Sequence, residues 1–234
     1  MRTVLIGGLL AAAGATAAFG QGAPVSRNYP VSGFDRIESA GPYHVEVRTG
    51  SAASVSASGP SEQMERLVVE VRNGELRIHP REDRKHLDRD QRGLVRVMVT
   101  VPQLRGAGLA GSGDMIVDQV HGASFEGSVA GSGNLTVRGI EVGALNLSVA
   151  GSGNASTGRG SARTVDISVA GSGNADTRST STSTASLSIA GSGKALAFAS
   201  GTANVSIIGS GDAQVVGGAR CAVSRVGSGR ANCS

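Results

Sequence analysis

The sequence contains very few aromatic residues. Phe, Tyr and Trp together make up 3% of the 234 residues, and Trp is absent. Apolar content is otherwise ordinary at 39%, so a core must consist of Val, Ile, Leu and Ala. Long stacked strands suit such a core, because every second residue of a strand enters a narrow interior. The shortage of rings also argues against a base-stacking platform for nucleic acid.

Charge of either sign is scarce as well. The chain has 22 Lys and Arg against 18 Asp and Glu, a net charge of +4, which falls to +3 if Arg2 is removed with a signal peptide. This balance is too mild to indicate a nucleic-acid partner, and the basic residues are not clustered with aromatic ones. No nucleic-acid partner is therefore expected.

Residues 1–20 are typical of a secretory signal peptide. Arg2 supplies the positive start, residues 4–18 are apolar, and the small residues before Gln21 form a cleavage site. The alternative is an uncleaved membrane anchor, but the apolar run is short for a span of roughly 20 residues. We therefore expect an exported protein, in the periplasm or at the cell surface, that contacts the membrane only through the signal peptide before cleavage.

Cysteine is limited to Cys221 and Cys233. An even count in an exported chain favours a disulfide between them, the alternative being a metal-binding pair. No His lies near either cysteine, and the four His residues show no metal-ligand spacing. We predict a disulfide, no metal site and no cofactor.

Glycine is abundant, with 36 residues, and much of it recurs in one motif. Gly-Ser-Gly begins at Gly111, Gly131, Gly151, Gly171, Gly191, Gly209 and Gly227. The spacing is 20 residues four times and then 18 twice. A fixed period of this length is typical of a solenoid, in which each repeat is one coil of a stack.

The residues around the motif alternate with period two. Positions two and four before it are mostly Val, Ile or Leu, whereas the position three before it is Ser in six repeats. A second strand with smaller apolar residues follows each motif. Two strands and two turns thus form one coil, with apolar columns inside and a Ser column outside. The sequence predicts an all-β fold: a single-stranded parallel β-helix (solenoid), flattened in cross-section, with about 18–20 residues per coil.

The motif itself is expected at one corner of each coil, where Gly permits a positive φ or a close backbone approach. The residue after the motif is predicted to stack on its equivalent one coil away, as a structural turn ladder. The predicted ladder residues are Asp114, Asn134, Asn154, Asn174 and Asp212. Cys221 and Cys233 fall in inward columns of the last coil, so their disulfide should pin the coil that lacks a further neighbour.

The part before the repeats is less regular. Residues 21–30, with Pro24 and Pro30, are predicted to be a flexible lead-in, and residues 31–234 a single β-helix domain whose repeats run from 104 to 234. Shorter strands are expected first. Two alternating runs flank Asn73-Gly74, which is the strongest short signal for a β-hairpin.

A dense run of both charge signs lies between residues 81 and 92. Such a run usually forms a solvated loop, and an interaction loop is the functional alternative. The basic residues that would serve such a loop are Arg81, Arg84, Lys85, Arg89 and Arg92.

Several stretches resemble the head GIN domain family, which is described as a family of autotransporter adhesins. They are Phe34-Asp35-Arg36-Ile37, Val45-Glu46-Val47, residues 67–78, Val101-Pro102-Gln103-Leu104 and the recurrent Ala-Gly-Ser-Gly-Asn. The resemblance extends from about Val31 to the C-terminus. It implies an exported β-helix of the cell envelope and carries no active site.

Enzymatic chemistry is the alternative to an adhesive or ligand-binding role, because many β-helices act on polysaccharides as lyases or hydrolases. Such enzymes need paired carboxylates or a metal with a base. The acidic residues of the repeats are scattered over different columns and coils, and their rare aromatics offer no sugar platform. We expect a non-enzymatic envelope module whose partner is a glycan or a protein, with self-association as a further possibility. Three acidic or basic residues converging in one groove would favour the enzyme.

Overall fold

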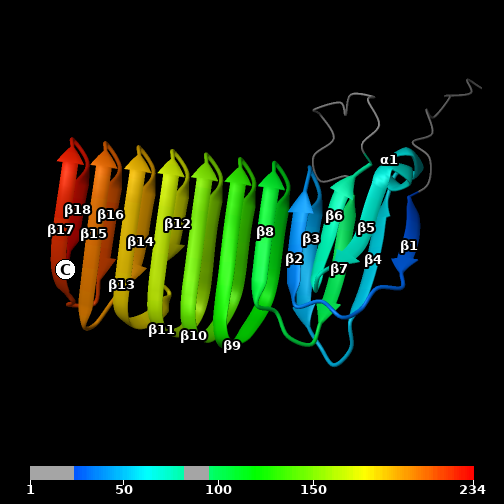
Figure 1. Ribbon diagram of the computed structural model, residues 1–234, viewed down its shortest axis with the longest axis horizontal. Coiled ribbons are helices and arrows are strands. Elements are labelled where there is room, and N and C mark those ends of the chain that lie inside the picture. The colour runs from blue at the N-terminus through cyan, green and yellow to red at the C-terminus, as the bar shows by residue number, and fades with distance from the viewer. Residues whose placement is uncertain (1–23, 82–94) are drawn as a thin grey trace, which may run out of the picture.

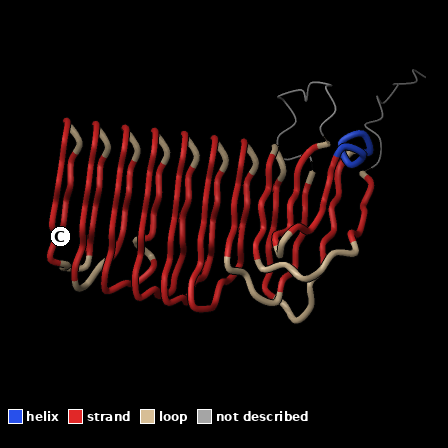
Figure 2. Tube along the Cα trace, in the orientation of Figure 1, coloured by secondary structure: helices blue, strands red, loops and turns tan. Residues whose placement is uncertain are grey.

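The chain forms a flattened solenoid, in which two walls of strands face each other across a thin interior (Figures 1 and 2). The computed structural model describes residues 24–81 and 95–234. The predicted all-β parallel solenoid with coils of 18–20 residues is confirmed. We name the two walls by their outward columns, the serine wall and the asparagine wall.

Each wall continues from the N-terminal strands into the repeats. The serine wall contains, in spatial order, β5 (Leu67–Arg72), β6 (Glu75–Pro80), β2 (Arg36–Ala40), β8 (Gly106–Gly111), the C-terminal halves of β9 (Asp114–Gly131), β10 (Asn134–Gly151) and β11 (Asn154–Gly171), then β13 (Thr180–Gly191), β15 (Thr202–Gly209) and β17 (Arg220–Gly227). The asparagine wall contains β1 (Val25–Tyr29), β4 (Ser54–Gly59), β7 (Arg96–Val101), β3 (His44–Thr49), the N-terminal halves of β9 to β11, then β12 (Asn174–Thr177), β14 (Lys194–Phe198), β16 (Asp212–Val216) and β18 (Arg230–Cys233).

The second corner of the coil differs from the sequence prediction. Two separate strands per coil were expected, but β9, β10 and β11 each run as one strand of 18 residues around that corner. Coils of equal length keep the corner in register, as the pairing of Gly139 with Arg159 illustrates. From the next coil onward the strand breaks at this corner, first between β12 and β13 in a coil of 20 residues and then between β14 and β15 in a coil of 18.

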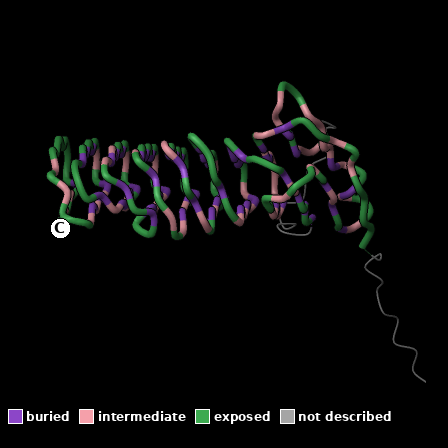
Figure 3. The backbone as a smooth tube through the Cα atoms, turned by 90° about the horizontal axis from the view of Figure 1, so that it is seen from below, coloured by how far each residue is buried: buried purple, intermediate pink, exposed green. Residues whose placement is uncertain are grey.

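The interior is closely lined by the predicted apolar columns (Figure 3). Val149, Leu147 and Val169 are at most 3% exposed, whereas Ser148 and Ser168 face solvent. Buried polar groups also occur near the second corner. There the Thr157 and Thr180 hydroxyls lie 2.7 Å apart and hydrogen-bond each other, so their burial costs little.

The Gly-Ser-Gly corners stack directly on one another. Gly151 has a φ of 113°, and its carbonyl oxygen accepts hydrogen bonds from the backbone N–H groups of Ser172 and Gly173 at 2.8 and 2.9 Å. The second glycine packs against the corner below, because a Cβ on Gly153 would lie 2.5 Å from the Gly133 carbonyl oxygen. Both glycines of the motif are therefore required, for different reasons.

The first corner of the stack has another sequence, Gly41-Pro42-Tyr43. The Gly41 carbonyl oxygen accepts a hydrogen bond from the Gly113 N–H at 3.0 Å, so the first Gly-Ser-Gly corner rests on it. The Tyr43 ring is 5% exposed, and burial, together with nearby Tyr29, raises the pKa of its hydroxyl to about 12. The stack of corners thus begins with a corner that lacks the Gly-Ser-Gly sequence.

The N-terminal end closes the solenoid with antiparallel strands. The hairpin of β5 and β6 turns at Asn73-Gly74, both with positive φ, as predicted. Helix α1 (Ser61–Arg66) buries Met64 beside it. The expected flexible lead-in is corrected for Val25–Tyr29, which pairs with β4 as an edge strand. Pro24 and Pro30 flank this strand and do not interrupt its ladder.

The spatial order of the first coils does not follow the sequence. The coil formed by β2 and β3 lies between β6 with β7 on one side and β8 with β9 on the other. Residues 36–49 are thus inserted between neighbours that come later in the chain. Within the described ranges, none of the helices has the length and apolar character needed to cross a membrane.

Candidate functional site

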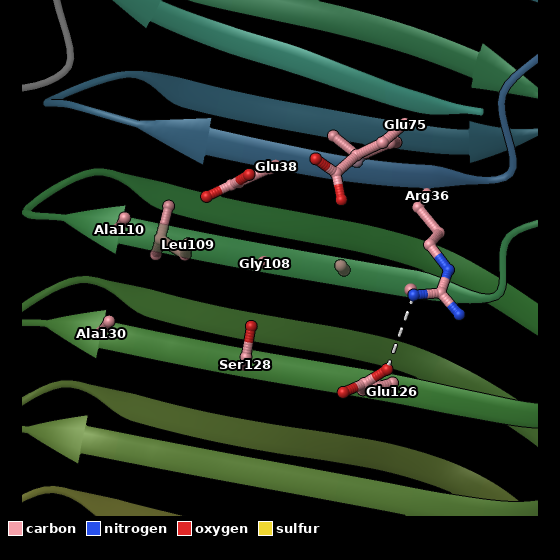
Figure 4. A pocket seen from close by; sticks show the side chains of 12 residues that line it. Arg36, Glu38, Glu75, Gly108, Leu109, Ala110, Glu126, Ser128 and Ala130 are labelled. Atoms are coloured by element: carbon pink, nitrogen blue, oxygen red, sulfur yellow. Dashed lines mark ion pairs between the residues drawn. The ribbon is translucent and has the colours of Figure 1, made fainter. Parts of the chain in front are cut away.

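A groove crosses the serine wall where β8 carries glycine instead of a side chain (Figure 4). Gly106 lies in register between Arg36 and Glu126, and Gly108 lies between Glu38 and Ser128. The cavity has a volume of about 200 Å³. Since a Cβ on Gly108 would meet Ser128 Oγ at 3.2 Å, the missing side chains make the groove.

Charged side chains form the sides of this groove. Arg36 reaches across Gly106, and its guanidinium lies 3.9 Å from the Glu126 carboxylate (Figure 4). On the other side, Arg77 lies 2.7 Å from Glu75 and 3.9 Å from Glu38. The hydrogen bond to Glu75 raises the pKa of Arg77 above its ordinary value. The groove therefore offers carboxylate acceptors and guanidinium donors at close range.

Two further hollows continue the groove along the serine wall. One shares Glu126 with the groove and extends over Asn146, Ser148 and Asp166, with a volume of about 290 Å³. The next shares Ser188 with it and extends to β17, with a volume of about 320 Å³. The three hollows form one track along the solenoid axis, which we call the serine track.

The sequence prediction missed the glycine groove. It treated the acidic residues as scattered, and it did not compare the repeats with residues 36–75, which supply Arg36, Glu38 and Glu75. A usable signal was present in β8. Gly106 and Gly108 occupy columns that later coils fill with larger polar residues, for example Asn146 and Ser148.

The predicted ladder residues lie on the opposite wall. Asn134 donates to Asp114 at 2.7 Å, Asn154 to Asn134 at 2.8 Å and Asn174 to Asn154 at 2.7 Å, in each case from Nδ2 to Oδ1. Lys194 takes the next place in the column, so Asp212 is separated from this row by a cation. The row connects neighbouring coils through these side-chain amides.

The predicted interaction loop is almost entirely outside the described residues. Arg84, Lys85, Arg89 and Arg92 lie in the undescribed range 82–94. Arg81 is described and exposed, and its backbone N–H donates to the Arg66 carbonyl oxygen at 2.8 Å. The five residues consequently stay a prediction.

Cys221 and Cys233 form the predicted disulfide. The bridge joins β17 to β18, whose Cα atoms are 6.5 Å apart at this point. Both residues are only partly buried, because the last coil is covered on one side. The bridge therefore holds the two walls together at the open end of the solenoid.

Replacing both cysteines by Ala should loosen this last coil without unfolding the rest. Closing a loop of 12 residues contributes about 3 kcal/mol in the chain-entropy model. We expect faster amide hydrogen exchange in β17 and β18, with exchange in β10 and β11 unchanged. Reduction of the wild-type disulfide should reproduce the effect, and equal protection of β17 with and without the bridge would contradict it.

The described residues contain no group of three or more His, Cys, Asp or Glu side chains placed to hold a metal ion. The strongest local charge pair on the asparagine wall joins Arg178 and Asp176 at 2.7 Å. Partial burial disfavours the Asp176 carboxylate, but hydrogen bonds from Arg178 prevail and lower its pKa. This pair ties two neighbouring residues together and leaves the groove as the candidate site.

A family comparison agrees with this architecture. Residues 33–219 match the model of the family described as "Putative auto-transporter adhesin, head GIN domain". The chain belongs to the head GIN domain family. The match ends just before β17, so the disulfide-bonded last coil lies beyond it. No curated protein matches the chain.

Solved structures share the fold of this head GIN domain protein. A "putative lipid binding protein" from Parabacteroides distasonis ATCC 8503 is 25% identical, with a TM-score of 0.72, covering 92% of this chain and 98% of its own. A "putative adhesin" from Bacteroides fragilis NCTC 9343 is 18% identical, with a TM-score of 0.80, covering 90% and 97%. Another from Parabacteroides merdae ATCC 43184 is 16% identical, with a TM-score of 0.69, covering 92% and 98%. The two "putative adhesin" structures support the fold alone.

Proposed function

We propose that this protein is an exported, non-enzymatic adhesin-type module of the cell envelope that holds an extended, hydroxyl-rich chain such as a glycan along the serine track. The observation that carries the proposal is the continuity of the three hollows from β2 to β17. A ligand lying along the axis would meet a new row of hydroxyl and amide groups at each strand, roughly every 4.8 Å.

The chemistry of the track suits a polyhydroxylated ligand. Ser128, Ser148, Ser168 and Ser188 each provide a donor and an acceptor, and the groove adds carboxylates and Arg36. The residues that line the three hollows include no aromatic ring, so each contact is weak. Affinity would then arise from many equivalent contacts along one polymer, as multivalent binding does.

An enzyme acting on polysaccharides is the second candidate, because the groove gathers Glu38, Glu75, Glu126 and Arg36. Each of these carboxylates has a guanidinium within 4.0 Å. A general acid must instead hold a proton near the operating pH, usually in an apolar setting. Carboxylates that are ion-paired and accessible to solvent therefore favour binding over catalysis.

The name of the Parabacteroides distasonis protein raises lipid as another ligand class. In the described part of this chain, the space between the walls is occupied by the apolar core. The proposal therefore assigns ligand binding to the outer surface. Phospholipid vesicles serve as the contrasting probe.

Gly108→Asn should weaken polymer binding at least about tenfold by placing an amide in the groove. The fold should be kept, because Gly108 has an ordinary backbone conformation and its nearest obstacle is the rotatable Ser128 hydroxyl. Binding is measured on immobilised neutral and uronic-acid polysaccharides, with release of reducing ends recorded in parallel.

Gly139→Asn is the matched control, since Gly139 lies at the second corner. A Cβ there would have the Gln119 side chain at 3.4 Å and the Asp118 carbonyl oxygen at 3.6 Å, both ordinary contacts. The control should bind like the wild type. Binding to phospholipid vesicles alone, or equal weakening by both substitutions, would contradict the groove. Release of reducing ends that is abolished by Glu126→Gln would replace the proposal with the enzyme.

A further inference from the structure

The outer edge of the last coil is open. β17 pairs with β15 and β18 with β16, and no described residue pairs with their other sides (Figure 1). Val223 occupies the inward column that is buried in the coils before it, but is 50% exposed here. Val226 and its register partner Ile208 are 67% and 61% exposed. An unpaired edge beside apolar side chains is a template for one more strand.

Arg225 determines which strand this edge can accept. It takes the inward place that Ile207 fills in the preceding coil. One of its nitrogens, Nη1, donates to the Gly229 carbonyl oxygen at 2.9 Å, which holds the guanidinium across the mouth of the coil. The guanidinium has five N–H donors, so most of them are free for an additional acceptor. An added strand with an apolar residue at this position would leave that charge uncompensated.

The charge around this edge is mostly positive, with Asp212 one coil back in register with Arg230. Residues 213–234 contain Arg220, Arg225 and Arg230 and no Asp or Glu. Neither Arg220 nor Arg225 forms an ion pair with a described residue, although other arginines of the chain do so. The edge therefore favours a partner that carries carboxylates.

A second copy of this chain is a poor occupant. Pairing two β17 edges would bring Arg220 and Arg225 of one copy against the same two arginines of the other, and like charges across an interface are costly. The strand at the opposite end of the asparagine wall, β1, carries Arg27 and no acidic residue. On β5, Glu70 is already bound by Arg72 and His79. Among residues 24–81 and 95–234, neither end of the solenoid offers an unpaired carboxylate in a free strand to match Arg225.

We propose that β17 is a docking edge for an extended acidic segment of a partner protein, which adds as the next parallel strand. In that register one apolar residue covers Val223, and an Asp or Glu two positions later faces Arg225. Backbone hydrogen bonds supply affinity, and the carboxylate supplies selectivity. The arginine disfavours apolar strands, including copies of the solenoid's own coils, relative to acidic ones.

The test uses three eight-residue peptides added to the full chain. Each copies Thr202–Gly209, the strand that β17 already accepts on its other side, with Ile207 kept, Ile207→Glu or Ile207→Lys. The Glu peptide should bind at least about tenfold more tightly than the Lys peptide, with the Ile peptide between them. Binding is measured by fluorescence anisotropy, and amide hydrogen exchange should show new protection in β17.

Arg225→Glu should reverse the order, so that the Lys peptide binds best. Arg225→Gln is the second variant, for the case that the reversed charge disturbs the coil. It removes the charge and should abolish the difference in affinity among the three peptides. Arg159→Glu is the matched control, because Arg159 is also exposed but lies on β11, and it should keep the wild-type order. Equal binding of the three peptides, absence of protection in β17, or a wild-type dimer that buries this edge would each overturn the proposal.

Discussion

Val149→Asp is expected to destabilise the solenoid by about 4 kcal/mol or more. Val149 is 1% exposed and faces the equivalent valines of the coils on both sides, Val129 and Val169. The substitution removes apolar burial and places a carboxylate in the interior, where burying a charge without a partner is among the costliest single changes. Urea and thermal unfolding followed by far-ultraviolet circular dichroism measure the loss.

Ser148→Asp is the matched control, one residue away on the same strand. Ser148 points outward to solvent, so the same carboxylate should change stability by less than about 1 kcal/mol. The two variants are compared by the ratio of their losses in stability. Unfolding of a repeat protein need not be two-state, and a single free energy of unfolding is then not well defined. Small and equal shifts in melting temperature would show that the two residues do not face opposite sides of the wall.

Gly153→Ala should have the second-largest effect, a loss of about 3 kcal/mol or more from adding one methyl group. The new Cβ would lie 2.5 Å from the Gly133 carbonyl oxygen and 2.6 Å from Val129 Cγ1. Relief requires the two coils to separate, which strains the hydrogen bonds that Gly131 and Gly133 accept from the next corner. Overpacking at a rigid backbone contact exceeds the usual cost of 1–3 kcal/mol for an extra methylene.

Ser152→Ala, in the same corner, removes a hydroxyl from an exposed residue and should leave the melting temperature close to the wild-type value. Comparison of the two alanine variants separates crowding from loss of the motif as such. If Gly153→Ala has the same melting temperature as Ser152→Ala, the corners must be packed more loosely than their stacking distance indicates.

The repeat region was predictable because one signal repeats with a fixed phase. Alternation around Val149 and Ser148 assigns both faces, and the position of Cys221 in an inward column anticipates the disulfide. Each coil confirms the register of the next. The same reasoning placed Val223 inward, but it did not predict that the Val223 side chain, in the last described coil, would be half exposed.

The N-terminal region was less predictable because pairing there is not local. Gly41-Pro42-Tyr43 performs the corner role of Gly-Ser-Gly, yet shares with it only the first glycine. Val25–Tyr29 forms a strand between two prolines through a partner 30 residues away in sequence, β4. Neither feature recurs along the chain, so no second copy in the sequence supports its prediction.

The groove illustrates a third kind of limit. Its floor forms because Gly106 and Gly108 have no side chains, and its charged side chains come from β2, β6 and β9. The sequence shows these residues as unrelated, because the out-of-order position of β2 brings them together. The topology, rather than any single motif, creates the site.

That inserted coil also governs how the chain can fold after export. A solenoid built in sequence order can grow one coil at a time behind the advancing chain. Here β2 and β3 acquire neighbours on one side only when residues 75–101 have arrived, and on the other only when residues 106–117 have. About half of the polypeptide must therefore emerge before its earliest coil can close, and the distant contacts slow that step.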